Sequence, residues 1–207
     1  YKRQGAFSDK NAGVGKTVTI TSSYSGADVS NYGVTDQSST TANITAKSLT
    51  VSGITASDKI YDGSTSSTLT GTAVYSGLVS GDIFTGSYTG VFANANVGTG
   101  KTVNITPSYS GADVSNYSVT DQSTTTANIT AKALTATASA SNKTYDGGTT
   151  ASTTLTFTGL VGSETLGQTV GSTFDNKNVG SNKTVTVNSI TLADGSGLAA
   201  NYSISAG

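Results

Sequence analysis

The sequence predicts an all-β protein built from tandem small domains, and three observations favour this class. Thr, Val, Ile and Tyr, which favour strands, are abundant, whereas the helix formers Leu, Glu, Arg and Gln are scarce. The 25 glycines and the many Asn, Asp and Ser residues favour turns. Long segments also recur at a fixed spacing. We expect small antiparallel domains, with an Ig-like sandwich favoured over a β-grasp-like variant.

Alternation and turn residues divide one complete repeat, residues 48–132, into five strands. The alternation is clearest in "KTVNIT", where Val103 and Ile105 share one face. The predicted strands are 48–55, 66–75, 83–92, 101–109 and 117–130, the last with a break at 121–122. Between the last two, "GADVSNY" at 111–117 predicts one helical turn.

Two long segments return with the same spacing. "SYSGADVSNY" at 23–32 recurs unchanged at 108–117, and "TTANITAK" at 40–47 recurs at 125–132, an offset of 85 residues in both cases. This period is longer than the solenoid coil of about 20–45 residues and suits one small domain per repeat.

A third motif occurs three times, beginning with Phe and ending with Lys: "FSDKNAGVGK", "FANANVGTGK" and "FDNKNVGSNK". An Asn-Tyr pair follows each copy. We predict structural roles for the recurring Phe, Lys and Tyr residues, which are Phe7, Phe92, Phe174, Lys16, Lys101, Lys183, Tyr32, Tyr117 and Tyr202.

The order of these motifs divides the chain into three parts. Residues 1–47 match the C-terminal half of a repeat, 48–132 form the complete repeat, and 133–207 form a repeat that lacks its last strand. We therefore expect a piece of a longer array. The joining segments 44–53 and 129–138 contain no Pro and no flexible Gly/Ser stretch, so we expect a semi-rigid rod.

The sequence Lys-x-Tyr-Asp-Gly occurs twice, in "KIYDGSTS" at 59–66 and "KTYDGGTT" at 143–150. Asp-Gly favours a tight turn, and a Tyr before it can bury its ring while its hydroxyl stays at a polar edge. We interpret the motif as a structural corner rather than a recurring reactive site. Its residues are Tyr61, Asp62, Gly63, Tyr145, Asp146 and Gly147.

The composition excludes several kinds of chemistry. Without His there is no Ser–His–Asp site, and without Cys there is neither a thiol nucleophile nor a disulfide. The repeated acidic residues lie in predicted turns, which does not favour a paired-carboxylate glycosidase. We predict that the chain is not an enzyme. The net charge of −1 and the absence of a basic stripe predict no nucleic-acid partner, and no apolar run is long enough to predict membrane insertion.

These motifs together resemble the YDG domain, which recurs in tandem in large bacterial surface adhesins of the filamentous haemagglutinin-like type. The resemblance is carried by "KIYDG", "GLVSGD" at 77–82, "FANANVGTGKTV", "SGADVSNY" and "TTANITAK", and it covers essentially the whole chain. The third repeat departs from it in "GLVGSETLG" at 159–167 and in three extra residues within 192–202. We expect both departures to fall in loops.

The resemblance implies an extracellular protein, secreted or on the bacterial cell surface. Its domains would form a stalk or spacer that projects a binding region and contributes to adhesion or biofilm. The partners would be neighbouring repeats of the same chain. The resemblance supplies no catalytic residue and no cofactor.

Other interpretations stay open at this point. The array itself could bind a matrix polysaccharide, or other copies of itself, through strand edges or tyrosines: Tyr24, Tyr32, Tyr75, Tyr88, Tyr109 and Tyr117. A Lys–Asn or Lys–Asp isopeptide bond is a further alternative. Calcium is a weak one, because the acidic residues form no Asp-x-Asp-x-Asp run.

Overall fold

The computed structural model describes residues 1–204 of the 207-residue chain. Within that range the regular elements are strands and three short 3-10 turns, which confirms the all-β class. The chain forms two compact units. The first comprises Tyr1–Ile54, Thr70–Thr89 and Ile105–Ser123, and the second comprises Thr55–Leu69, Gly90–Asn104 and the chain from Thr124 onward. Each unit thus combines part of the central repeat with one neighbouring repeat.

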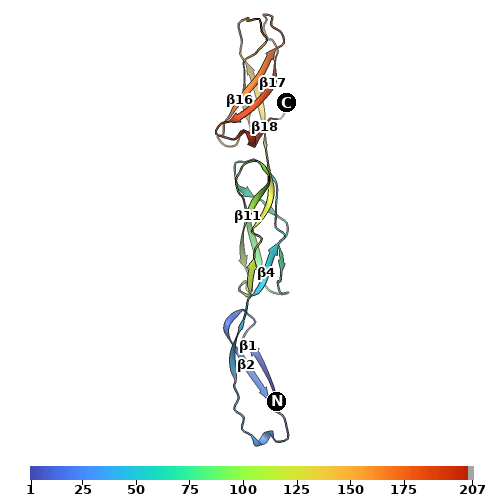
Figure 1. Cartoon of the computed structure of the whole chain (residues 1–207), viewed down its shortest axis with the longest axis vertical. Coiled ribbons are helices and arrows are strands. Elements are labelled where there is room, and N and C mark those ends of the chain that lie inside the picture. The colour runs from blue at the N-terminus through green and yellow to red at the C-terminus, as the bar shows by residue number, and fades with distance from the viewer. Residues whose placement is uncertain (205–207) are drawn as a thin grey trace. The chain divides into compact units, whose positions relative to one another are not determined.

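The first repeat contributes one antiparallel sheet to the first unit. The sheet has the order β1-β2-β3, and β1 and β2 lie side by side in Figure 1. Its strands are β1 (Lys2–Phe7), β2 (Gly13–Ser23) and β3 (Ser39–Ile44). The 3-10 turn η1 (Val29–Asn31) lies in the connection from β2 to β3.

The central repeat contributes a second three-stranded sheet to this unit, in the order β12-β4-β9. Its strands are β12 (Tyr117–Thr120), β4 (Lys47–Ser52) and β9 (Val74–Ser76). β12 runs parallel to β4, with Tyr117 opposite Lys47. The expected helical turn is present as η2 (Val114–Asn116), directly before β12.

An aromatic cluster forms the core of the first unit. Leu49, Phe84 and Tyr117 are buried there. The Phe84 ring packs edge-on against Tyr117 with centroids 5.7 Å apart, and it also contacts Tyr75 at 5.3 Å and Tyr109 at 5.0 Å. Edge-on aromatic pairs add to the stability that burial of their apolar area provides.

A five-stranded sheet of the central repeat runs through the second unit, in the order β6-β13-β11-β10-β7. Its strands are β6 (Lys59–Ile60), β13 (Thr124–Thr130), β11 (Gly98–Ser110), β10 (Thr85–Phe92) and β7 (Ser66–Ser67). A separate two-stranded sheet consists of β5 (Thr55–Ala56) and β8 (Leu69–Thr70).

The third repeat adds five strands to the second unit. They form a sheet of order β15-β14-β18 and a hairpin of β16 and β17, which is visible in Figure 1. The strands are β14 (Lys132–Ala140), β15 (Thr153–Thr158), β16 (Leu166–Phe174), β17 (Val185–Asp194) and β18 (Tyr202–Ile204). The 3-10 turn η3 (Ala199–Asn201) precedes β18, which runs parallel to β14.

The core of the second unit draws on both repeats. Phe92, Val103 and Ile129 come from the central repeat, and Leu134 and Tyr202 come from the third. Each apolar side chain of this size stabilises the fold by about 1.5–3 kcal/mol when it is fully buried. The two repeats therefore share one hydrophobic core in this unit.

Three predictions about the strands were wrong. The segment 48–55 is not one strand, because Gly53 adopts a φ of +85° and lies between β4 and β5. The segment 66–75 is not one strand either, because Gly71 adopts a φ of +81° and separates β8 from β9. The pairing is also not wholly antiparallel, because β12–β4, β13–β6 and β14–β18 are parallel pairs. The predicted break at 121–122 is confirmed between β12 and β13. The sandwich, the β-grasp-like variant and the rod stay predictions.

Gly111→Ala is expected to destabilise the protein more than Gly26→Ala. Both glycines occupy equivalent positions with positive φ, +131° and +147°. A Cβ at Gly111 would lie 2.2 Å from the Ile83 carbonyl oxygen, whereas at Gly26 the nearest neighbour is Val29 Cγ2 at 3.6 Å. We expect Gly111→Ala to lower the unfolding free energy by about 1–3 kcal/mol more than Gly26→Ala, measured by urea denaturation. Equal losses would contradict this account.

Candidate functional site: the joints between repeats

The Lys-x-Tyr-Asp-Gly segment of the central repeat forms a corner closed by its own side chains. Lys59 Nζ donates to Asp62 Oδ1 at 2.7 Å and to the carbonyl oxygens of Ser64 and Ser66 at 2.8 and 3.1 Å. The Ser64 amide donates to the same Asp62 oxygen at 2.8 Å. The hydrogen bond from Lys59 lowers the pKa of Asp62. Lys59 and Asp62 therefore hold this turn together.

The third repeat has the same corner. Lys143 Nζ donates to Asp146 Oδ1 at 2.8 Å and to the carbonyl oxygens of Gly148 and Thr150 at 2.9 and 3.1 Å. Gly147 has a φ of +78°, close to the +77° of Gly63. In both corners the Lys ammonium also lies over the Phe ring that begins the Phe–Lys motif, which is the segment 92–101 or 174–183. Lys59 Nζ lies 5.6 Å from the centroid of the Phe92 ring, and Lys143 Nζ lies 5.7 Å from the centroid of the Phe174 ring.

Tyr61 points out of its corner toward the third repeat. Its hydroxyl donates to Glu164 Oε1 at 2.7 Å, and the Tyr202 hydroxyl donates to Glu164 Oε2 at 2.6 Å. The two tyrosine rings meet edge to face, with centroids 5.4 Å apart. The hydrogen bond to Glu164 is the main reason why the pKa of Tyr61 is raised to about 12. Since Glu164 belongs to the third repeat, Tyr61 forms part of a joint between repeats.

A buried amide completes this joint. Asn201 is 1% exposed. Its Oδ1 accepts a hydrogen bond from the Val97 amide at 2.9 Å, and its Nδ2 donates to Asn96 Oδ1 at 3.2 Å. Gly63 also approaches the third repeat, because a Cβ there would lie 2.9 Å from Val161 Cγ1. Both polar groups of Asn201 are thus satisfied by the Phe–Lys loop of the preceding repeat.

The same amide contact recurs 85 residues earlier, inside the first unit. Asn116 Oδ1 accepts a hydrogen bond from the Ala12 amide at 2.8 Å. Asn116 Nδ2 donates to Asn11 Oδ1 at 3.2 Å. In both joints the Asn of an Asn-Tyr pair therefore holds the "Asn-Ala" or "Asn-Val" backbone of the preceding repeat's loop.

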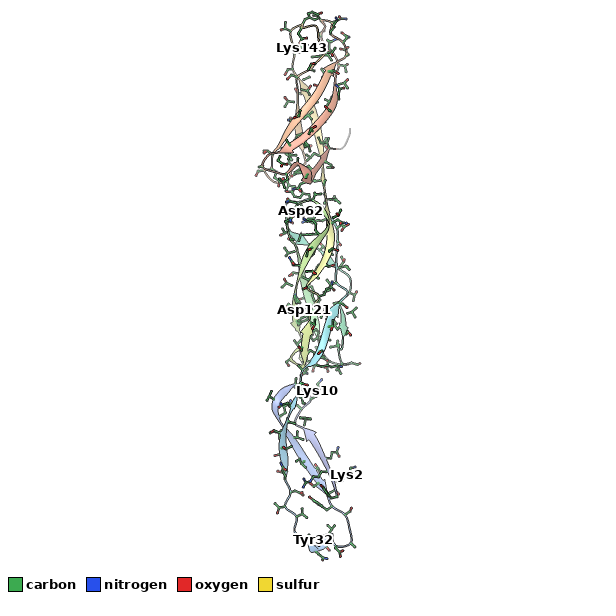
Figure 2. The ribbon with its side chains drawn as sticks, in the orientation of Figure 1. Lys2, Lys10, Tyr32, Asp62, Asp121 and Lys143 are labelled. Atoms are coloured by element: carbon green, nitrogen blue, oxygen red, sulfur yellow. The ribbon has the colours of Figure 1, made fainter. Side chains whose placement is uncertain are left out.

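The first joint lies between the first and central repeats, and the second joint lies between the central and third repeats. The acidic residue has different hydrogen-bond partners in the two joints. In the first joint Lys10 Nζ lies 2.9 Å from Asp82 Oδ1 and 3.0 Å from Asp113 Oδ1, and the Tyr117 hydroxyl donates to Asp82 Oδ2 at 2.6 Å. The hydrogen bonds from Tyr117 and then Lys10 lower the pKa of Asp82. Lys10 lies next to the central repeat in Figure 2. Its counterpart in the second joint is Ala95, and there the Tyr61 hydroxyl donates to the acidic residue.

The lysines that end the Phe–Lys motifs close their own loops. Lys16 Nζ contacts Asp9, Lys101 Nζ donates to Asn94 Oδ1 at 2.7 Å, and Lys183 Nζ donates to Asn176 Oδ1 at 2.8 Å. The three phenylalanines differ in burial: Phe92 is buried, Phe174 is half-buried and Phe7 is 43% exposed. The lysines therefore shape the loops whose Asn backbone enters the joints.

Several residues of the joints are not predicted from the sequence motifs. The motifs predict roles for Tyr, Phe and Lys, but not for the Asn residues beside them. They place Glu164 only in a loop that departs from the repeat, although it aligns with Asp82 in "GLVSGD". The recurrence of Asn11 at Asn96, and of Asn116 at Asn201, was the signal that could have found these contacts.

The tyrosines considered for sugar binding mostly face the protein. Tyr117 is buried, Tyr24, Tyr75, Tyr88 and Tyr109 are half-buried, and Tyr32 is 74% exposed. Burial raises the pKa of Tyr88 to about 12. Most of these rings are therefore not open platforms.

A comparison with protein families matches the YDG domain at residues 45–127 and again at 130–207. The chain belongs to the YDG domain family. Comparison with curated proteins and with solved structures gave no significant match. Each of the two joints described above thus involves at least one YDG domain, and the second joint lies between the two matched segments.

Within residues 1–204, the described part of the chain, no group of three or more Asp or Glu residues is placed to hold a metal ion. Over the same residues, no helix has the length and apolar character that crossing a membrane requires.

Tyr61→Phe is expected to weaken the second joint. The change removes the hydroxyl that pairs with Glu164 Oε1 and keeps the ring, so the loss of unfolding free energy should be about 1–3 kcal/mol in urea denaturation. The matched control is Tyr145→Phe, at the equivalent position of the third repeat, where the side chain is 58% exposed. Equal effects of the two variants would contradict a joint role for Tyr61.

The contribution of Tyr61 to the free energy of unfolding is also expected to decrease at alkaline pH. Its pKa rises from the ordinary 10.0 to about 12 in the folded protein, so the stability it provides is complete below pH 10 and is lost as the pH rises through 12. The difference in unfolding free energy between wild type and Tyr61→Phe should therefore shrink over this interval. A difference that stays constant or grows would refute this linkage.

Proposed function

We propose that these YDG domains are stalk or spacer modules of a secreted or cell-surface bacterial adhesin of the filamentous haemagglutinin-like type. They would project a binding region and contribute to adhesion or biofilm. The observation that carries the proposal is the recurring joint, in which Asn116 and Asn201 make the same two hydrogen bonds to the preceding repeat. A spacer needs a contact of this kind, because it must transmit the position of one domain to the next.

The short connections between repeats support the same proposal. Only Thr45 and Ala46 separate β3 from β4, and only Ala131 separates β13 from β14. A connection of one or two residues between strands leaves little rotational freedom, so the side-chain contacts of the joint act on domains that are already close. In this role the chain needs neither a catalytic residue nor a cofactor.

The alternative, in which the array itself binds a polysaccharide or self-associates through strand edges, has less support. It requires accessible aromatic faces, and five of the six tyrosines considered are buried or half-buried. Tyr32, at the far end of the first repeat in Figure 2, is the exposed member of that set.

Small-angle scattering tests the spacer. The wild-type chain should fit one stiff conformer, equally in calcium and in chelator, whereas the double variant Asn116→Ala/Asn201→Ala should require a broad ensemble of domain orientations. The control is Asn43→Ala, since Asn43 accepts a hydrogen bond from Gly15 inside one repeat. A wild-type chain that is flexible, or that stiffens only with calcium, would overturn the proposal.

A further inference from the structure

We infer that the central repeat is a tensile clamp: the segment by which the chain enters it runs parallel to the segment by which the chain leaves it, so that tension along the chain loads the bonds between them in shear. The inference goes beyond the proposed spacer, because a spacer fixes a distance whereas a clamp resists a force. Its use rests on the proposed function, since a stalk that is anchored at one end and bound at the other is pulled along its chain.

The two segments pair in parallel in both units. The entering segment, residues 47–60, contains β4, β5 and β6, and the leaving segment, residues 117–130, contains β12 and β13. In the first unit β4 pairs with β12 over four residues of each strand, beginning with Tyr117 opposite Lys47. In the second unit β6 pairs with β13, again in parallel. The backbone hydrogen bonds between the two segments are therefore present in each unit.

Two side-chain bridges also join the segments. Gln122 Nε2 donates to the Ile54 carbonyl oxygen at 2.6 Å, and the Ile54 amide donates to Gln122 Oε1 at 3.0 Å. Asp58 accepts hydrogen bonds from the Asn128 amide at 2.7 Å and from Asn128 Nδ2 at 2.8 Å. Ile54 and Asp58 both lie between strands of the entering segment. The bridges thus continue the contact where the backbone pairing is interrupted.

Apolar side chains on both segments shield these bonds from water. Leu49, Val51 and Ile54 of the entering segment are buried, and so are Ala127 and Ile129 of the leaving segment. Water that cannot reach a hydrogen bond cannot replace the lost partner while the bond is being stretched. The burial therefore makes the bonds between the segments harder to open by force.

The direction of the load decides how these bonds break. Tension reaches the entering segment at its N-terminal end and the leaving segment at its C-terminal end. Because the segments run parallel, these are opposite ends of the paired strands, so the pull slides one strand past the other. All the bonds of the pair then carry the load together, whereas strands that are pulled apart from the same end lose their bonds one after another.

The third repeat has the same arrangement. Its entering strand β14 pairs in parallel with β18, and Tyr202 lies opposite Lys132. In the central repeat Tyr117 lies opposite Lys47. The register between the two strands is thus identical in both repeats, which indicates that the parallel pair is a property of the domain rather than of one copy.

The test pulls the full chain in two directions by single-molecule force spectroscopy. Since the chain contains no Cys, two introduced cysteines provide unique attachment points. Ala46→Cys with Ala133→Cys loads the segments in shear, and Ala46→Cys with Ser115→Cys separates the N-terminal ends of β4 and β12. All three positions are exposed. We expect the unfolding force to be at least about twofold higher in shear than in the second direction.

Two variants make the result specific. Gln122→Ala removes one bridge and should lower the ratio of the two forces. The control Asn201→Ala removes contacts of the second joint but lies outside both segments, so it should keep the ratio of the wild type.

Equal forces in the two directions, or a ratio that Gln122→Ala leaves unchanged, would overturn the clamp. The proposed spacer would stand in that case, because it depends on the stiffness of the joints that scattering measures. A wild-type chain that is flexible in scattering but has the higher force in shear would overturn the spacer and support the clamp.

Discussion

The joints depend on one constraint: a half-buried carboxylate must have a partner for each of its two oxygens. In both units one oxygen is satisfied within the same repeat, by Tyr117 for Asp82 and by Tyr202 for Glu164. The other oxygen accepts a hydrogen bond from the preceding repeat, through Lys10 or Tyr61. An unpaired carboxylate at such a place costs more than the pair contributes, so each repeat is completed by its neighbour.

The Asn of the Asn-Tyr pair, which is buried at Asn201 and half-buried at Asn116, acts under the same constraint. Its amide has one acceptor and two donor hydrogens, and in both joints the acceptor meets a backbone amide of the preceding loop. Lys101 and Lys16 hold those loops in the required shape. In the second joint, hydrogen bonds determine which polar groups of the two repeats meet. The shared core around Phe92, Leu134 and Tyr202 buries apolar surface there.

The Lys-x-Tyr-Asp-Gly motif makes contacts both within its own repeat and with the next repeat. Lys59 and Asp62 close the corner on itself, and Gly63 supplies the positive φ and the room for Val161. The Tyr61 hydroxyl reaches the next repeat through its hydrogen bond to Glu164. One short segment thus closes a turn through Lys59 and Asp62 and also places the Tyr61 hydroxyl at the joint.

The sequence by itself determined the all-β class, the 85-residue period, the alternation at Val103 and Ile105 and the break between β12 and β13. These features follow from local propensity and from side-chain periodicity, which act over a few residues. The tertiary structure decided the parallel pairing of β4 with β12, and the partner that Tyr61 finds 103 residues away. Such contacts depend on which polar groups become buried when distant segments pack, and no local pattern in the chain specifies that.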